Sequence, residues 1–567
     1  MFSNRKIWLA YLIVFISSTC GLVIELVAGR IMAPYIGVSL YTWTSIIGVV
    51  LAGISLGNYL GGVVADRRAS RSTLGLLFLA GGLASAGILS STAVVTSTSW
   101  PLPLVPKIVF LTTAIFFLPS LILGMVSPVV IKLALQDLGR TGNVVGSIYA
   151  FSTVGSIFGT FITGFWLISW LGTRTIVWAV ALLLVGMGVV GARQPARRTA
   201  LGLAGLALFS LALWLDASGL YRWFPAVAGQ GLALATLPVT VLLPLGLVGA
   251  CFARPRIGLA AGLLVFPAFG LVYFGWDAGL YKAPCQVESN YYCIRTDEQT
   301  VDGHPVRALV LDHLVHSYVS LDDPGVLGYG YERVYDELTT YYASQHGRGL
   351  DTLFIGGGGY TFPRYIEATY PEATIDVLEI DPAVTQAAHD FLGLPADTRV
   401  RSFDSDARAF LMSWEDPKKF DIVYGDAFND LSVPYHLTTV EFDRLVAGRL
   451  KDDGLYMVNV IDKYEGGEFM KAFANSLREV FPHVYLLAQG KAWLFPDANT
   501  YILLASRAPL DVAKFEAVVG KGGSTLSKVL PDAQLDSYLS SGRAITLTDD
   551  YVPVDQLVAP LFIERGF

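Results

Sequence analysis

The chain is poor in the residues from which metal sites and nucleic-acid surfaces are built. It has four cysteines and seven histidines among 567 residues, only 15% of its residues are charged, and its formal net charge is −7. Four cysteines are too few for a disulfide scaffold. His313 and His316 have no cysteine or acid at ligand spacing, so we expect no metal site. The lack of a basic excess excludes nucleic acid as a partner.

Apolar residues are in excess, and they are concentrated in the first half of the chain. Hydrophobic residues make up 53% of the sequence, and the mean hydropathy of +0.52 is too high for a soluble protein of this length. Several apolar segments are long enough to span a bilayer. These nine segments are 8–28, 40–65, 73–95, 107–134, 144–170, 174–192, 199–215, 231–252 and 257–275.

We therefore predict three parts in this chain. Residues 1–276 form an all-α polytopic membrane domain of eight or nine helices, with the lipid bilayer as its partner. Residues 277–345 form a linker and a small β unit, and residues 346–567 form a Rossmann-like α/β domain. Arg5 and Lys6 precede an apolar run that lacks a small-residue cleavage site, so we expect a retained first helix.

The side of the membrane on which the α/β domain lies stays open at this point. Basic residues occupy alternate loops, which places the N-terminus in the cytoplasm, and nine spans would then leave the second half outside. A nucleoside-type cosubstrate is normally made in the cytoplasm, and this favours the cytoplasmic side. Cys285 and Cys293 could pair if the domain lies in an oxidising compartment.

The segment Leu353–Asp381 carries the clearest indication of a binding site. A buried-looking strand runs into Gly356, Gly357, Gly358 and Gly359, and a second strand ends about twenty residues later at an acid. Glycines let the backbone turn sharply and approach a ligand closely. The pattern predicts a nucleoside site in a doubly wound, mainly parallel sheet.

Acids stand at the carboxyl ends of three successive predicted strands. Glu379 ends the second strand, Asp406 follows the third, and Asp426 ends the fourth. In an open α/β sheet, ligands bind at these strand ends. Glu379 can hold ribose hydroxyls, Asp406 can accept from an adenine amino group, and Asp426 lies where the reacting centre would be.

These residues resemble the polyamine aminopropyltransferases, the spermidine synthase family. The chain looks like the bacterial subgroup in which such a domain, of class I methyltransferase-like fold, is fused to a major-facilitator-like membrane domain. The segment Gly62–Arg68 resembles a loop signature of those transporters. The matching motifs are Ile355–Gly358, Leu378–Pro382, Asp404–Arg408, Asp421–Asp426, Leu437–Thr438, Lys451–Gly454 and Val310–His316.

The resemblance implies an enzyme of the plasma membrane that moves an aminopropyl group from decarboxylated S-adenosylmethionine to an amine such as putrescine. The products are spermidine and methylthioadenosine, and no cofactor is bound permanently. By resemblance Asp426 is the catalytic carboxylate, while Glu379, Asp406, Ala407 and the glycine loop bind the nucleoside. The soluble family forms dimers, so a homodimer is one expected arrangement.

The residues expected at the amine site are less well matched. They are His316, Tyr335, Asp336, Asn429 and Asp430. The family has an acid where this chain has Gly359, and another where it has Asn429. Two alternatives stay open. The missing acid at Gly359 favours an S-adenosylmethionine-dependent methyltransferase, and the nine apolar segments motivate a polyamine or nucleoside transporter or sensor with a regulatory soluble domain.

Overall fold

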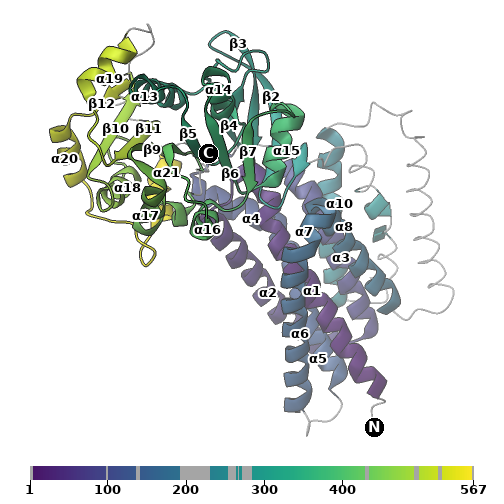
Figure 1. Cartoon of the computed structure of the whole chain (residues 1–567). Helices are drawn as coiled ribbons and strands as arrows, with labels where there is room; N and C mark the ends of the chain where they lie inside the picture. The colour runs from purple at the N-terminus through teal and green to yellow at the C-terminus, as the bar shows by residue number, and fades with distance from the viewer. Residues whose placement is uncertain are drawn as a thin grey trace. The chain divides into compact units, whose positions relative to one another are not determined.

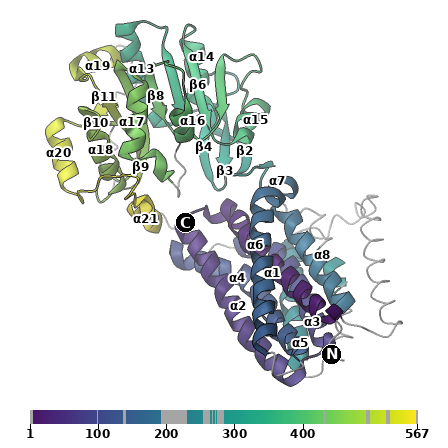
Figure 2. The ribbon, with the colours of Figure 1, turned by 60° about the horizontal axis from the view of Figure 1, so that its bottom comes forward.

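The computed structural model describes eleven stretches of the chain, and it divides into two compact units, Met1–Ala283 and Pro284–Phe567 (Figures 1 and 2). The described residues are 4–97, 100–135, 141–191, 230–252, 264–265, 267–270, 272, 284–427, 433–490, 497–520 and 527–564. The division falls seven residues beyond the predicted end of the membrane domain at 276, and the small β unit belongs to the second unit.

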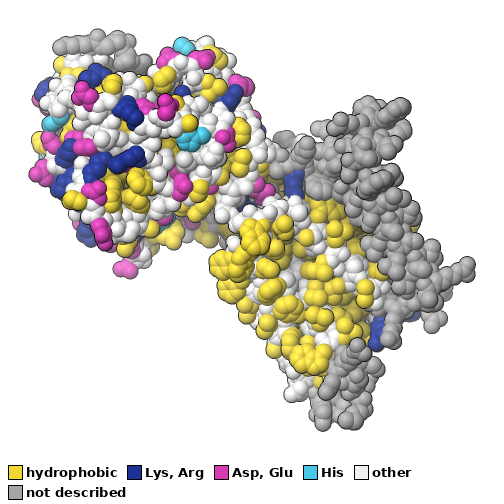
Figure 3. Space-filling model, turned by 45° about the vertical axis from the view of Figure 1, so that its right-hand side comes forward, with side chains coloured by type: hydrophobic (Ala, Val, Ile, Leu, Met, Phe, Trp, Pro, Cys, Tyr) yellow, Lys and Arg dark blue, Asp and Glu magenta, His cyan; other side chains and the backbone are white. Residues whose placement is uncertain are grey.

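The first unit is helical, as predicted. Among the described residues, six helical segments are long and apolar enough to cross a membrane. Figure 3 shows mainly hydrophobic side chains on the exposed face of these helices, with Tyr59 70% and Trp170 76% exposed. The helices are α1 Asn4–Ile36, α2 Leu40–Arg68, α3 Arg71–Thr96, α4 Leu104–Gly124, α5 Val126–Ala134, α6 Thr141–Ile162, the π-helix Thr163–Leu167, α7 Ile168–Leu171, α8 Thr173–Gly191 and α10 Gln230–Phe252.

The six helical segments correspond to the first six predicted spans, and α10 corresponds to the span predicted at 231–252. The segment at 199–215 and most of 257–275 lie outside the described residues. Glycines bring the helices close together. A Cβ added at Gly57 of α2 would lie 2.1 Å from the Leu121 carbonyl oxygen of α4, so only glycine fits there.

The second unit begins with a small antiparallel sheet of order β1-β2-β3-β4. Its strands are β1 Val287–Glu288, β2 Cys293–Val301, β3 His304–Leu311 and β4 Leu314–Val319. Asp302 and Gly303 join β2 to β3 with φ angles of 50° and 83°. Asp and Gly suit this hairpin because both tolerate the left-handed backbone of such a turn.

The large sheet has the order β12-β10-β11-β9-β8-β5-β6-β7. Its strands are β5 Asp351–Ile355, β6 Thr374–Glu379, β7 Val400–Asp404, β8 Phe420–Gly425, β9 Leu450–Asp462, β10 His483–Gln489, β11 Asn499–Ser506 and β12 Ser527–Val529. The strands from β5 to β9 are parallel, whereas β10, β11 and β12 pair antiparallel. The sheet is thus mixed rather than mainly parallel, since the short connection between β10 and β11 permits only a hairpin.

Helices accompany this sheet (Figure 1). They are α13 Gly330–His346, α14 Thr361–Thr369, α15 Pro382–Phe391, α16 Ala407–Ser413, the 3₁₀ turn Tyr435–Leu437, α17 Val440–Arg449, α18 Phe469–Arg478, α19 Val512–Val519, α20 Asp532–Ser540 and α21 Val554–Glu564. The core contains Phe354 and Tyr424, whose rings stack at 4.4 Å between centroids, with Phe362 of α14 beside them. The parallel register aligns Ile355 with Gly425 and Leu378, which brings the strand ends together.

Asp421 joins three elements at the opposite edge of the parallel strands. Its buried carboxylate accepts hydrogen bonds from the Asp351 amide at 2.8 Å, the Lys451 ammonium at 2.8 Å and the Tyr342 hydroxyl at 2.9 Å. Removing a buried carboxylate leaves such donors without their acceptor, which costs more than losing an exposed pair.

We expect Asp421→Ala to destabilise the α/β unit by about 3 kcal/mol, because three donors lose a buried acceptor. The measurement is thermal unfolding of the full-length protein. Asp452→Ala is the matched control, since the Asp452 side chain is 98% exposed and its pair with Arg507 is 3.4 Å long. Equal shifts for the two variants would contradict this account.

Candidate active site

The glycine loop after β5 lies directly against the end of β8. The Asp426 amide donates to the Ile355 carbonyl at 2.9 Å. Gly356 has a φ of 99°, and a Cβ there would lie 2.4 Å from the Asp426 carbonyl oxygen. Only glycine fits this backbone and this space. The close contact fixes the glycine loop beside the Asp426 side chain.

Glu379 holds the glycine loop from the other side. One carboxylate oxygen accepts from the amides of Gly357 at 2.8 Å and Gly358 at 3.2 Å, and the other accepts from the Asp381 amide at 3.0 Å. Burial raises the pKa of the Glu379 carboxyl, and these three hydrogen bonds act in the opposite direction. The side chain is therefore rigidly oriented at the end of β6.

Two cavities flank this loop. The first, which we call the Glu379 cavity, is lined by Tyr291, Tyr292, Glu379, Asp406, Ala407 and His436 among others. The second, the tyrosine cavity, is lined by Tyr329, Tyr331, Glu332, Tyr335, Phe362 and Asn459 among others. Gly356, Gly358, His316 and Asp426 line both. The two cavities thus meet at Asp426.

Asp406, two residues after the end of β7, has two hydrogen-bond partners. One oxygen caps α16 by accepting from the Ala409 amide at 2.8 Å, and the other lies 2.7 Å from Nε2 of His436. The sequence predicted the acid but not the histidine. His436 comes from the 3₁₀ turn after β8, thirty residues along the chain, and only the fold brings it to Asp406.

Asp426 is the acid at which both cavities converge. Its two carboxylate oxygens accept from the Tyr331 hydroxyl and from the side-chain amide of Asn459, each at 2.8 Å. Burial raises the pKa of the Asp426 carboxyl, and the two hydrogen bonds moderate that rise. A carboxylate held in this way can accept a proton from a nucleophile bound in the tyrosine cavity.

The tyrosine cavity has a second acid that the sequence interpretation missed. Glu332 is 2% exposed, and its carboxylate accepts from the Tyr329 amide at 2.9 Å at the start of α13. Burial raises the pKa of Glu332 to about 8. Tyr335, which the sequence placed at the amine site, lines the same cavity and donates its hydroxyl to the Gly425 carbonyl at 3.2 Å.

Two predicted site residues line neither of the two cavities, and two others lie outside the described residues. Asp336 accepts from the Tyr365 and Thr340 hydroxyls and is not among the described lining residues of either cavity. Gly359 lines neither cavity, because its amide donates to Ser317 Oγ at 2.8 Å and a Cβ there would lie 2.6 Å from Ser317 Cβ. Asn429 and Asp430 lie outside the described residues.

Part of this chain is similar in sequence to curated polyamine aminopropyltransferases. It is 31% identical over 130 residues to a probable polyamine aminopropyl transferase of Bifidobacterium longum, covering 23% of this chain and 28% of that protein. It is 33% identical over 108 residues to a polyamine aminopropyltransferase of Vibrio vulnificus, covering 19% and 36%. Over these segments the chain is therefore similar to polyamine aminopropyltransferases. No family model matches it.

Two further comparisons complete this picture. A probable spermidine synthase from Corynebacterium glutamicum aligns over 47% of this chain and 97% of its own, at 22% identity and a TM-score of 0.42. An N-terminal histidine N-methyltransferase of Emericella nidulans is 29% identical over 167 residues, covering 28% of each protein. The chain thus matches only about a third of the length of its first aminopropyltransferase relatives.

We expect Glu379→Gln to weaken binding of methylthioadenosine at least tenfold, about 1.4 kcal/mol. An amide at this position would turn an N–H group toward the amides of Gly357 and Gly358 and disturb the loop. Isothermal titration calorimetry gives the affinity, with the exposed Glu372→Gln as the matched control. Unchanged affinity in Glu379→Gln would remove Glu379 from the nucleoside site.

Proposed function

We propose that this protein is a membrane-anchored aminopropyltransferase. It moves the aminopropyl group of decarboxylated S-adenosylmethionine to an amine such as putrescine and releases spermidine and methylthioadenosine. The observation that carries the proposal is the meeting of two cavities at Asp426. One cavity has acids placed for a nucleoside, and the other has aromatic rings and a second acid suited to a cationic amine.

In this reaction the lone pair of the amine attacks the carbon next to the sulfonium. A carbon–nitrogen bond forms, and the carbon–sulfur bond breaks with its electron pair going to sulfur. Asp426 takes the proton of the amine, because only the neutral amine is a nucleophile. Tyr331 and Asn459 orient the carboxylate by their hydrogen bonds, so it meets the amine in one direction.

The Glu379 cavity holds the nucleoside end of the donor in this proposal. Glu379 accepts from the ribose hydroxyls with lone pairs that remain beside its backbone hydrogen bonds. Asp406 accepts from the adenine amino group, and His436 fixes the orientation of Asp406. Ala407, which lines the same cavity, packs against the base. The glycine loop admits the donor close to the backbone.

The tyrosine cavity favours a decarboxylated donor. Ser317 fills the space that an acid at position 359 would need, so Glu332 supplies the second carboxylate that attracts an amino group. Among the described residues that line this cavity, none is lysine or arginine. The carboxylate of ordinary S-adenosylmethionine would face Asp426 and Glu332 there.

Methyl transfer is the second candidate. The sequence relationship to a histidine N-methyltransferase and the glycine at position 359 favour it. A methyltransferase would use the Glu379 cavity in the same way and would release S-adenosylhomocysteine. The two reactions are therefore distinguished by the donor and by the sulfur-containing product.

The helical unit would anchor the enzyme in the bacterial plasma membrane. Six described helical segments have the length and composition that a bilayer requires. In this proposal the lipid bilayer and the two small-molecule substrates are the partners, and a homodimer follows from the resemblance alone.

We expect Asp426→Asn to lower the rate of spermidine formation about 10² to 10⁴-fold while nucleoside binding is retained, since an amide cannot accept the proton. Mass spectrometry of the full-length protein with putrescine and the decarboxylated donor gives the rate. Asp404→Asn, at an exposed position at the end of β7, is the control. Methylthioadenosine formation at the wild-type rate by Asp426→Asn would exclude the proton-accepting role, and S-adenosylhomocysteine from the ordinary donor would support methyl transfer.

The pH dependence of the wild-type rate checks the same role. The ordinary pKa of aspartate is near 4, and burial raises the pKa of Asp426 above it. As the pH falls, Asp426 should therefore become protonated, and the rate should be lost, at a higher pH than for an exposed aspartate. The rate should rise with pH through that raised pKa, and Asp426→Asn should lack this rise.

Glu332→Gln should raise the KM for putrescine about tenfold and leave kcat within about twofold, because Glu332 attracts the cation and does not take the proton. Steady-state kinetics at several putrescine concentrations separate the two constants. Asp336→Asn is the matched control on α13, since Asp336 faces Tyr365 and Thr340. A loss confined to kcat in Glu332→Gln would contradict this assignment.

A further inference from the structure

Basic residues are unevenly distributed between the two ends of the described helices in the first unit. Lys132 at the end of α5 donates to Asp66 near the end of α2 at 3.0 Å, so these two helix ends lie together. Arg67, Arg68 and Arg71 lie at the same place along the chain. We call this the basic end, and the positive-inside rule assigns it to the cytoplasm.

The N-terminus belongs to the basic end as well. A Cβ at Gly155 of α6 would touch Phe15 of α1, and one at Gly159 would touch Thr19, so α1 and α6 run in the same direction. Since α6 follows α5 at the basic end, α1 also starts there, with Arg5 and Lys6. The opposite ends of the helices carry Arg30, Lys107 and Arg174. These are fewer than the basic residues of the basic end.

Helix α10 runs toward the basic end. Its Thr240 lies 3.2 Å from Ser90 in the second half of α3, whereas Cys251 at its end lies 3.9 Å from the Thr73 carbonyl at the start of α3. Since α3 begins at Arg71, α10 ends at the basic end. Arg254 and Arg256 follow immediately in the sequence, as the positive-inside rule requires.

Phe269 lies well away from that end. Its ring is 5.3 Å from the ring of Trp178 in α8. In α8, Gly188 packs against Leu79 near the start of α3, and Trp178 lies ten residues earlier, about 15 Å further from the basic end. The chain has therefore passed from the basic end at Cys251 into the far half of the bundle by Phe269. Residues 257–275 carry no charge and are long enough to span.

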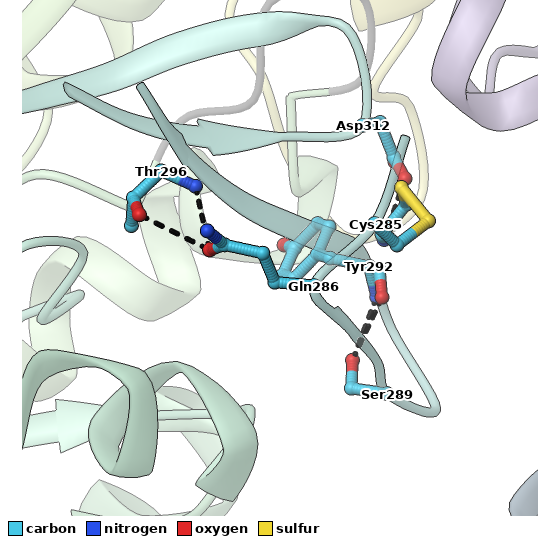
Figure 4. Close-up of a disulfide and its surroundings, with 7 residues drawn as sticks. Cys285, Gln286, Ser289, Tyr292, Thr296 and Asp312 are labelled. Carbon is cyan, nitrogen blue, oxygen red and sulfur yellow. Dashed lines mark hydrogen bonds between the residues drawn. A yellow bond between two sulfur atoms is a disulfide. The ribbon is translucent and has the colours of Figure 1, made fainter. Parts of the chain in front are cut away.

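A disulfide in the second unit also indicates that the chain has left the cytoplasmic side of the membrane. Cys285 and Cys293 are bonded within the first ten residues of the α/β unit (Figure 4). The hairpin itself brings them together, since the Gln286 amide donates to the Ile294 carbonyl at 2.8 Å. Disulfides of this kind persist in extracytoplasmic compartments and are reduced in the cytoplasm of most organisms.

The loop that the disulfide closes is part of the site. Tyr291 and Tyr292 line the Glu379 cavity. Ser289 accepts from the Tyr292 amide at 2.8 Å and donates its hydroxyl to Asp381, the N-cap of α15. Figure 4 shows the disulfide together with the hydrogen bonds between Ser289 and Tyr292 in this loop. The disulfide thus anchors one wall of the Glu379 cavity.

We infer that the α/β unit lies on the extracytoplasmic side of the membrane, where the Cys285–Cys293 disulfide forms and holds the cavity wall in place. The inference rests on the membrane anchoring proposed above but not on the proposed reaction. It reverses the expectation based on cosubstrate supply. Donor and amine would then be bound outside the cytoplasm, so a nucleoside-type donor must be exported to this site or formed there.

Cysteine labelling in intact cells tests the side. The background is the full-length Cys20→Ala/Cys251→Ala variant, which removes the two buried free cysteines. Into it we place either Gln299→Cys on the exposed part of β2 or Asp66→Cys at the basic end. A membrane-impermeant maleimide should label the cysteine at 299 and not the one at 66 until the cells are opened. Labelling at 66 and not at 299 would overturn the inference, and alkaline extraction of the membranes tests the anchoring separately.

The thiol state and its effect on binding test the disulfide. In the same background without added cysteines, a maleimide should modify no thiol in the denatured protein before reduction and two after it. Two reactive thiols without reductant would overturn the disulfide. Cys285→Ser/Cys293→Ser should bind methylthioadenosine several-fold more weakly than Cys20→Ala/Cys251→Ala, and reduction of the wild-type protein should have the same effect. Equal affinity in all forms would remove the role of the disulfide in the cavity.

Discussion

The site depends on the close contact between the backbone of Gly356 and that of Asp426. Parallel pairing brings the ends of β5 and β8 together, and the missing side chain at 356 lets them touch. Glu379 then fixes the glycine loop through two backbone amides. Because both cavities open at this contact, every group that faces a ligand is positioned relative to it. A side chain at 356 would push the ends of β5 and β8 apart.

Burial of carboxyl groups determines what this site can attract. Burial raises the pKa of Glu332, Glu379 and Asp426, so each carboxyl is costly to ionise without a partner. Hydrogen bonds from backbone amides offset this cost for Glu379, and hydrogen bonds from Tyr331 and Asn459 offset it for Asp426. A bound cation would lower the cost for the acids of the tyrosine cavity. The electrostatics of this cavity therefore favour a bound cation over an anion.

Much of the fold follows from local patterns. The α/β organisation predicted for residues 346–567 is present, because each element has its own hydrophobic period and its own turn. The antiparallel half of the sheet and α19 to α21 were not foreseen, since pairing direction depends on contacts beyond the local sequence. Asn459 could have been found, as β9 is the next parallel strand beside Asp426.

The sequence by itself determined the apolar helices, the strand–helix alternation, the glycine loop and the acids at the strand ends, because spacing along one chain segment sets each of them. Only the tertiary structure decided which groups share a cavity. It brought Glu332 to Asp426 and His436 to Asp406, turned Asp336 toward Tyr365, and filled the space beside Gly359 with Ser317. These contacts join residues on different elements, and local sequence patterns do not determine how the elements pack against one another.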